Sequence, residues 1–183
     1  YIIQKINQYC SNAETCIDIA GNKGLFSKLI ISQTNIRKVI CQDLDHKAVN
    51  TGFDEWKGDN NHEGQITYVH YNAFSPLLKL GQPLPSQRFK SDLVICLALL
   101  HHLILSQGYS IEFVLDELAR YTKKYIVVEF MPKGLWLRDS IVNIPAWYSV
   151  EWFKSSFEER FDILDEEKID DNYIVFVGRL KSA

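Results

Sequence analysis

One stretch near the start of the chain limits the folds open to it more than any other. Residues 16–30 read Cys-Ile-Asp-Ile-Ala-Gly-Asn-Lys-Gly-Leu-Phe-Ser-Lys-Leu-Ile. Residues 16–19 have the apolar character of a buried strand, residues 20–24 are typical of a tight turn, and the remainder predicts a helix. The expected inner face of that helix carries Leu25, Phe26, Leu29 and Ile30. The stretch therefore predicts a strand, turn and helix that together hold a nucleotide.

The turn residues have chemical properties that suit such a site. Gly21 and Gly24 lack a Cβ, so the backbone can bend sharply and a ligand or neighbouring strand can approach closely. Asn22 tolerates positive φ better than most residues, and the start of the following helix favours an anionic group. Asp18, at the end of the strand, is placed to accept a hydrogen bond either from a cationic amine or from the turn itself. A ligand carrying both an amine and a carboxylate would suit this arrangement.

A second acidic strand end follows at a spacing that nucleotide-binding units use. Residues 38–45 predict a strand that closes on two acids, and Asp43 comes 19 residues after Gly24. In nucleotide-binding βαβ units, a carboxylate about 20 residues beyond the glycines binds the ribose hydroxyls. We therefore predict that Asp43 binds a ribose and that Asp45 caps a helix over 46–56. The alternative is that Asp43 is itself a helix cap.

The rest of the chain alternates between helical and strand-like patterns. A helix is expected at 1–10, and a near-continuous apolar run over 91–103 predicts a central strand buried on both faces. Further strands are expected at 66–70, 125–130, 161–165 and 173–177, further helices at 111–121 (capped by Ser110) and 150–157, and loops at 57–64 and 75–91. The last two strands are expected to form an antiparallel hairpin. The aromatic segment 131–145 is expected to form a lid or acceptor pocket, or to cover the sheet.

Polar residues follow two of the predicted central strands. His101 and His102 end the apolar run at 91–103, and Glu129 lies near the end of the strand at 125–130. Ligands of doubly wound sheets bind beyond the carboxyl ends of the strands. We expect one histidine to face the cleft, as a general base or as a hydrogen-bonded residue that holds the loop, and the other to face the next helix. Glu129 has the same two interpretations, a functional acid or a salt-bridge and cap contact.

Composition narrows the class of protein. A chain of 183 residues with 46% hydrophobic content suits one domain, and a net charge of −3 gives no general reason to expect nucleic acid as a partner. The four cysteines show no C-x-x-C spacing, so we expect buried free thiols in a cytoplasmic protein. The scattered histidines do not predict a metal site, and neither a signal peptide nor a membrane-length apolar run is present, so we expect no membrane partner. The chain begins with Tyr1, which leaves open a further domain upstream.

The turn resembles motif I of the class I S-adenosylmethionine-dependent methyltransferases, whose pattern is acid-x-Gly-x-Gly-x-Gly. On that pattern Asp18 is the acid, Ala20 and Asn22 take the first two glycine positions, and Gly24 takes the third. The resemblance extends over essentially the whole chain. The segments 22–27, 43–45, 92–103, 127–130 and 148–153 resemble bacterial nodulation-protein-related methyltransferases, in which Asn at this motif position is expected.

This resemblance implies a fold, a cofactor and a set of site residues. The fold is α/β, a single domain over 1–183 with a doubly wound, Rossmann-like, seven-stranded sheet, mostly parallel with one antiparallel strand and with helices on both faces. S-adenosylmethionine is the implied cofactor: Asp18, Ala20, Gly21, Asn22, Lys23 and Gly24 would hold its methionyl end, Asp43 its ribose, and Leu44, Asn72 and Ala73 its adenine. His101, His102 and Glu129 are the catalytic candidates, with a histidine as base if the acceptor is a hydroxyl or an amine.

Two other functions stay open at this point. The replaced glycines at Ala20 and Asn22 fit a catalytically degenerate scaffold domain of a larger protein. The hypothesis of an NAD-type oxidoreductase is less favoured, because the dinucleotide-binding pattern Gly-x-Gly-x-x-Gly is absent. The methyl acceptor is not identified, and a small molecule or a protein is favoured over nucleic acid.

Overall fold

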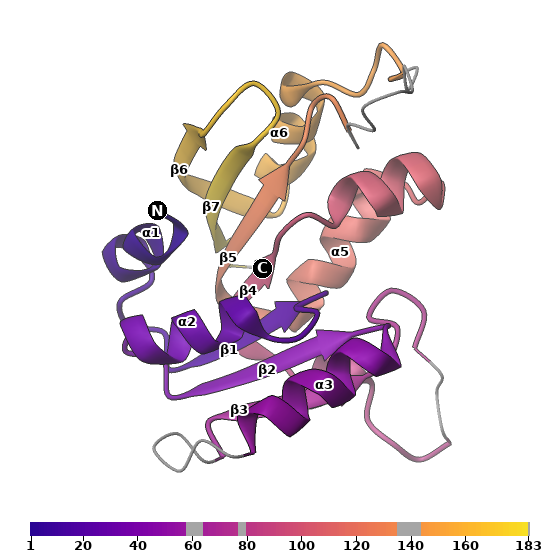
Figure 1. Cartoon of the computed structure of the whole chain (residues 1–183). Coiled ribbons are helices and arrows are strands. Elements are labelled where there is room, and N and C mark those ends of the chain that lie inside the picture. Colours follow the sequence, from indigo (N-terminus) through magenta and orange to yellow (C-terminus); the bar gives the residue numbers. More distant parts are fainter. Residues whose placement is uncertain (58–63, 77–79, 135–143, 183) are drawn as a thin grey trace.

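The computed structural model describes residues 1–57, 64–76, 80–134 and 144–182, and its centre is a seven-stranded sheet (Figure 1). The strand order is β3-β2-β1-β4-β5-β7-β6. The strands are β1 (Thr15–Ile19), β2 (Lys38–Asp43), β3 (Ile66–His70), β4 (Ser91–Cys96), β5 (Thr122–Phe130), β6 (Phe161–Lys168) and β7 (Ile174–Leu180). Strand β7 is antiparallel to both β5 and β6, whereas β1 to β5 pair in parallel. The expected doubly wound sheet with one antiparallel strand and a terminal hairpin is confirmed.

Helices cover both faces of this sheet. They are α1 (Ile2–Tyr9), α2 (Leu25–Gln33), α3 (His46–Trp56), α4 (Pro85–Arg88), the π-helix η1 (His102–Ser106), α5 (Ile111–Tyr121) and α6 (Val150–Glu158). Buried residues of α1, α2 and α3 form one core with one face of the sheet, and buried residues of η1, α5 and α6 form a second core with the other face. Figure 1 shows α2 and α3 on the near side of the sheet and α5 behind it.

The sequence explains this double core directly. Side chains alternate along a strand, so Cys16 and Leu93 join the first core while their neighbours Ile17 and Val94 join the second. Apolar residues at both kinds of position are what a parallel strand buried on two faces requires. The parallel strands β1 to β5 therefore end at one edge of the sheet, where their loops can converge.

Several local predictions are confirmed. Helices over 46–56 and 111–121 and the strand at 66–70 have the expected bounds. The Asp45 side chain accepts hydrogen bonds from the backbone N–H groups of Lys47 and Ala48, and the Ser110 side chain accepts one from Phe113. Both residues are therefore helix caps, as expected. All four cysteines are free and buried.

The central strand ends earlier than its apolar run suggests. β4 stops at Cys96, and Ala98 then adopts a left-handed backbone with φ 51°. The carbonyl of Leu99 accepts hydrogen bonds from His102 and Leu103, which starts a helical turn. The expectation that 91–103 is one strand is wrong because the apolar residues after Cys96 are buried from a turn and a π-helix instead.

The predicted inner face of α2 is confirmed for Phe26 and Ile30 and is wrong for Leu25 and Leu29. Ile30 is buried and Phe26 packs against the first core, whereas Leu25 and Leu29 are 69% and 43% exposed. Ser27 also lies on the inner face, where its hydroxyl donates to the buried Asp18 carboxylate. The inner face of α2 thus includes a polar contact that the apolar pattern does not predict.

Two predicted loops lie largely outside the described residues. Of the loop at 57–64 the structure describes 57 and 64, and of the segment at 131–145 it describes 131–134 and 144–145. The connection predicted as a loop at 75–91 contains the short helix α4.

Candidate functional site

The turn between β1 and α2 has three residues in the left-handed region. The φ angles of Ala20, Asn22 and Gly24 are 61°, 52° and 75°, and the N–H of Gly24 donates to the carbonyl of Gly21 at 2.8 Å. The expected positive φ at Asn22 and Gly24 is confirmed. Ala20 holds a conformation that costs an L-residue about 1–2 kcal/mol, at a position where the methyltransferase motif has glycine.

Gly21 is required for close approach rather than for a positive φ. A Cβ built at this position would lie 2.8 Å from Asp18 Oδ2 and 2.8 Å from Cys41 Sγ. Its N–H donates to the carbonyl of Gln42 at 2.9 Å, which fixes the turn against β2. The missing side chain therefore lets the Asp18 carboxylate pack directly beneath the turn.

Asp18 accepts its hydrogen bond from the first turn of α2, which is neither of the two alternatives that the sequence left open. The residue is 3% exposed, and Ser27 Oγ donates to its Oδ2 at 2.7 Å. Burial raises the pKa of Asp18 to about 6; the hydrogen bond from Ser27 lowers it and the nearby Asp43 charge raises it further. Asp18 thus supports the helix start from below.

Asp43 connects two loops at the edge of the sheet. Its Oδ2 accepts from the N–H of Asn22 at 2.8 Å, and its Oδ1 accepts from the N–H of Asp45 at 2.8 Å. The first-turn N–H groups of α3 bind Asp45, so Asp43 is not the helix cap. Each carboxylate oxygen has a second lone pair, and the residue therefore keeps acceptor capacity for a ligand.

Two polar residues of β2 and β3 hold this edge together and were missed in the sequence. Gln42 is 2% exposed, accepts from the N–H of Ala20 at 3.4 Å and donates to the carbonyl of Tyr71. His70 Nε2 lies 3.0 Å from the carbonyl oxygen of Leu44. A polar residue inside an apolar strand was the available signal for Gln42; no pattern pointed to His70.

A tyrosine from β3 fixes the outer side of the turn. Tyr68 Oη donates to the carbonyl of Lys23 at 3.3 Å. A Cβ at Gly24 would lie 2.6 Å from Tyr68 Oη, and one at Gly52 would lie 2.6 Å from the carbonyl oxygen of Lys23. The two glycines let α3, β3 and the turn pack without intervening side chains.

A cavity of about 110 Å³ lies beside the turn, at the carboxyl ends of the parallel strands. Its lining consists of Ile19, Ala20, Gln42, Asp43, Leu44, Asn72, Ala73, Phe74, Leu99, Leu103 and Gln107. Five of the predicted cofactor residues line it, namely Ala20, Asp43, Leu44, Asn72 and Ala73. Gly21, Asn22, Lys23 and Gly24 form the adjoining turn. The lining from the segment after β4 (Leu99, Leu103 and Gln107) was missed, because Leu99 and Leu103 fall in the strand predicted at 91–103 and no pattern pointed to Gln107.

The chemical groups at this cavity fit a nucleoside. Asn72 Oδ1 accepts from the N–H groups of Phe74 and Ser75, at 3.0 and 3.2 Å, so its amide nitrogen is the group left to donate. Leu44 is 61% exposed and offers an apolar surface beside the Asp43 carboxylate. An acceptor for hydroxyls, an amide donor and apolar walls are the groups that a ribose and a purine base need.

The two histidines lie together at the start of η1, with His101 directly before this helix and His102 as its first residue. Their ring centroids are 4.2 Å apart, and His101 is 3% exposed. Successive residues in a helical turn point about 100° apart, so the two rings can lie close together and still face different ways. The expectation that one of them faces the cleft stays a prediction. Burial, with a contribution from His102, lowers the pKa of His101 to about 4. Its Nε2 has no hydrogen-bond partner in the described part of the chain.

Glu129 contacts the loop that follows β4. Its carboxylate accepts a hydrogen bond from the backbone N–H of Ala98, and burial raises its pKa. Glu129 therefore holds the residue at which the chain leaves β4 with φ 51°. His101, His102 and Glu129 are not among the residues that line the cavity beside the turn.

The described residues lack two kinds of feature. They contain no group of three or more His, Cys, Asp or Glu side chains arranged to hold a metal ion. None of the helices in the described ranges is both long and apolar enough to cross a membrane.

Comparison with solved structures identifies the architecture. No protein-family profile and no curated protein sequence matches the chain. The PH0226 protein from Pyrococcus horikoshii OT3 superposes with a TM-score of 0.72 at 16% identity, over 97% of this chain and 87% of that one. The magnesium protoporphyrin IX methyltransferase of Synechocystis PCC 6803, crystallised with bound SAM, gives 0.67 at 15% identity, over 98% and 76%. The chain has the methyltransferase fold.

The methyltransferase fold also relates the chain to the group suggested by its motifs. The N-methyltransferase NodS from Bradyrhizobium japonicum WM9 superposes with a TM-score of 0.66 at 10% identity, over 99% of this chain and 93% of that one. The resemblance to nodulation-protein methyltransferases therefore holds at the level of the fold.

Proposed function

We propose that this chain is an S-adenosylmethionine-dependent methyltransferase. The observation that carries the proposal is the β1–α2 turn, held in a left-handed conformation and tied through Asn22 to the Asp43 carboxylate at the end of β2. This pairing of a turn before a helix with an acid on the neighbouring strand is suited to a ligand that carries a ribose. The methyltransferase fold supports the choice of S-adenosylmethionine over other nucleosides.

Different residues at the cavity bind different parts of the cofactor. Asp43 binds the ribose hydroxyls through its remaining lone pairs, and Leu44, Asn72 and Ala73 hold the adenine. The turn over 21–24 holds the methionyl end, with the exposed Lys23 able to pair with its carboxylate. Asp18 supports the turn from beneath. When bound, S-adenosylmethionine supplies an electrophilic methyl group on a sulfonium.

Alignment of the acceptor and exclusion of water provide the main rate enhancement in a methyl transfer of this kind. His101 is unprotonated at neutral pH, and its pKa of about 4 makes it a weak base. We therefore assign the base to His102 for a hydroxyl or amine acceptor, and to no residue for an acceptor that is already nucleophilic. Glu129 acts by positioning the loop at Ala98.

The proposal extends to the location of the enzyme, its domain organisation and its acceptor. We propose a cytoplasmic protein, supported by four free cysteines that are all buried. Residues 1–183 form one catalytic domain, which can belong to a longer chain. Its acceptor is a small molecule or a protein. A degenerate scaffold is the second candidate, and it is favoured by the methyl group of Ala20, which narrows the approach to the ligand where the motif has glycine.

Calorimetric titration of the purified chain tests the proposal. S-adenosylmethionine and S-adenosylhomocysteine are each titrated beside NAD, into the unmodified chain and into Asp43→Ala and Asp45→Ala. Asp45 makes the matched control, because it lies two residues away and caps α3 without lining the cavity. We expect both sulfur ligands to bind, and the Asp43 variant alone to lose most of the affinity.

The other outcomes separate the alternatives. Binding without turnover on a broad acceptor panel favours the scaffold. Binding of NAD alone overturns the assignment of the cofactor. Failure of a demonstrably folded chain to bind any of the three rejects the active-enzyme proposal.

A further inference from the structure

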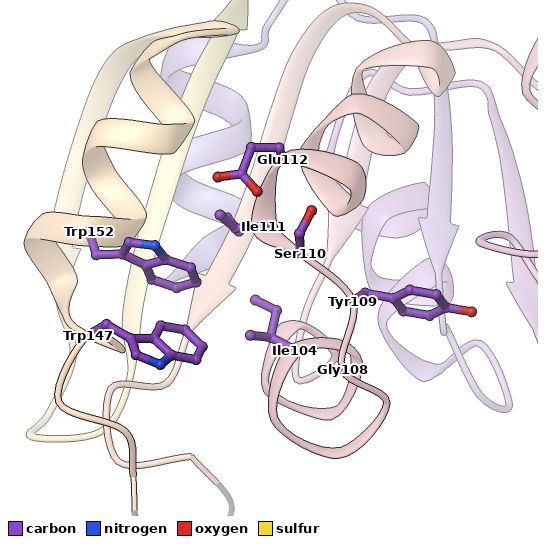
Figure 2. Close-up of a pocket in the computed structure, with 8 residues that line it drawn as sticks. All are labelled: Ile104, Gly108, Tyr109, Ser110, Ile111, Glu112, Trp147 and Trp152. Atoms are coloured by element: carbon purple, nitrogen blue, oxygen red, sulfur yellow. The ribbon is translucent and has the colours of Figure 1, made fainter.

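A second pocket lies on the other side of η1 from the cavity beside the turn. Its volume is about 370 Å³, and Ile104, Gly108, Tyr109, Ser110, Ile111, Glu112, Trp147 and Trp152 line it (Figure 2). The walls come from η1, the first turn of α5, and the start of α6 with the residues before it. Leu103 lines the first cavity and its neighbour Ile104 lines the second, so η1 is a shared wall.

Two indole rings make one side of this pocket. Figure 2 shows Trp147 and Trp152 together, facing Ile104 and Ile111 across the gap. Their ring centroids are 4.9 Å apart with an interplanar angle of 64°, so the rings meet at an angle rather than stacking flat. Trp147 is 52% exposed although it is large and apolar. An angled pair of open aromatic rings is the arrangement that receives an organic cation in known recognition sites.

The position of the rings is fixed by the helix that follows. Ser149 caps α6 by accepting a hydrogen bond from the backbone N–H of Trp152. The Trp152 ring also packs on Tyr148, at 5.6 Å between centroids, and Tyr148 is buried against Phe130 of the second core. The pocket wall is therefore anchored to the sheet before any ligand arrives.

A carboxylate completes the pocket. Glu112 stands in the first turn of α5, and Figure 2 shows its carboxylate directed towards the tryptophan side. Within the described ranges Glu112 makes no ion pair, whereas the nearby acid Asp116 of α5 is paired with Arg160 at 2.5 Å. The Tyr109 ring points away from the tryptophans and packs on Phe113. The pocket thus offers two aromatic faces and one unmatched negative charge.

We propose that this pocket binds a small organic cation that carries an alkylated ammonium group. The ammonium lies against the faces of Trp147 and Trp152, its alkyl groups contact Ile104 and Ile111, and Glu112 supplies the opposite charge. A volume of about 370 Å³ is within the range of small-molecule sites, about 300–1,000 Å³. This site goes beyond the proposed methyltransferase function and uses none of the residues assigned to the cofactor.

Nuclear magnetic resonance of the tryptophan indole N–H groups tests this site without any cofactor. The chain has four tryptophans, and single Trp→Phe variants assign their signals. Choline chloride is the probe, its uncharged isostere 3,3-dimethylbutan-1-ol is the comparison, and sodium chloride controls for ionic strength. We expect saturable shifts at Trp147 and Trp152, with choline binding roughly tenfold more tightly than the alcohol because only choline has the charge.

A matched pair of variants tests the role of the carboxylate. Glu112 and Glu151 are each the second residue of a helix, α5 and α6, but Glu151 does not line the pocket. Glu112→Gln should weaken choline binding several-fold, whereas Glu151→Gln should leave it unchanged. Equal binding of choline and the alcohol, equal effects of the two variants, or no saturable shift would each overturn the proposal. None of these results bears on binding of S-adenosylmethionine.

Discussion

Replacing Gly24 with alanine should be among the most damaging single-methyl additions to this chain. Gly24 has φ 75°, and a Cβ built there lies 2.6, 2.9 and 3.0 Å from three atoms of the Tyr68 ring and hydroxyl. Gly64 has φ 76° and nothing within 4 Å of its Cβ position. The two glycines therefore share a backbone conformation and differ in what surrounds them, which makes Gly64→Ala the matched control.

The expected magnitudes follow from that difference. A left-handed backbone costs alanine about 1–2 kcal/mol, and the stiffer unfolded chain returns about 0.4–1 kcal/mol, so Gly64→Ala should lower the free energy of unfolding by about 0–1.6 kcal/mol. Gly24→Ala carries the same net cost plus an overpacking cost of about 1–3 kcal/mol. Tyr68 is held by its hydrogen bond to Lys23 and by the packing of Gly52, so it has little room to move. The difference between the two variants should be roughly 2 kcal/mol.

Urea denaturation followed by far-UV circular dichroism measures both free energies of unfolding. The double variant Gly24→Ala with Tyr68→Ala removes the atoms that collide, so it should be more stable than the sum of the single changes predicts, by at least about 1 kcal/mol. Equal losses for Gly24→Ala and Gly64→Ala, or strict additivity with Tyr68→Ala, would refute the packing described for the turn. Gly24→Ala should also weaken binding of S-adenosylmethionine, while Gly64→Ala should not.

Three further predictions concern strain and titration. Ala20→Gly should raise the free energy of unfolding by up to about 1 kcal/mol, because relief of the left-handed φ exceeds the entropy that glycine loses on folding; a loss of stability in urea would contradict this. The pKa of Asp18 is raised to about 6, so its stabilising contribution is complete below pH 4 and is lost as the pH rises through 6. Between pH 4 and 7 the free energy of unfolding of Asp18→Asn should therefore rise by up to about 3 kcal/mol relative to that of the unmodified chain. A difference between the two chains that does not depend on pH would show that the acid is not buried as described. The pKa of His101 is lowered to about 4, so its contribution to stability is present above pH 6.5 and is lost as the pH falls through 4. The free energy of unfolding of His101→Phe should therefore fall less steeply with decreasing pH than that of the unmodified chain. Identical pH profiles would argue against a buried His101.

The sequence predicted the sheet, and the part of the site formed by β1, β2 and the loops after them, because both depend on local signals. The glycines and Asn22 in the turn, Asp43 at its spacing, and the cap residues Asp45 and Ser110 each specify a backbone feature within a few residues. Such local features depend little on the rest of the fold. Their arrangement around one cavity then follows from the parallel order of β1 and β2.

The part of the site formed by the segment after β4 depends on contacts that no local pattern encodes. The apolar run after Cys96 is compatible with a strand, a turn or a π-helix. In the structure the chain turns at Ala98, whose N–H contacts Glu129 on another strand, and this contact cannot be read from the run itself. The inward face of α2 likewise includes Ser27, whose hydrogen bond to Asp18 no apolar pattern predicts, while Leu25 and Leu29 are exposed. Hydrophobic periodicity finds apolar faces, but it does not identify a buried polar pair.

The place of β7 in the sheet makes the order of synthesis matter. Among the described strands β7 is made after β5 and β6, yet it lies between them and supplies the partner for one side of each. While a ribosome still holds residues 174–180, the nucleoside side of the sheet can already form from consecutive βαβ units, but β5 presents an open row of backbone N–H and C=O groups. Translation that stops before residue 174 should therefore yield an aggregating fragment with an unpaired strand edge, not a smaller folded enzyme.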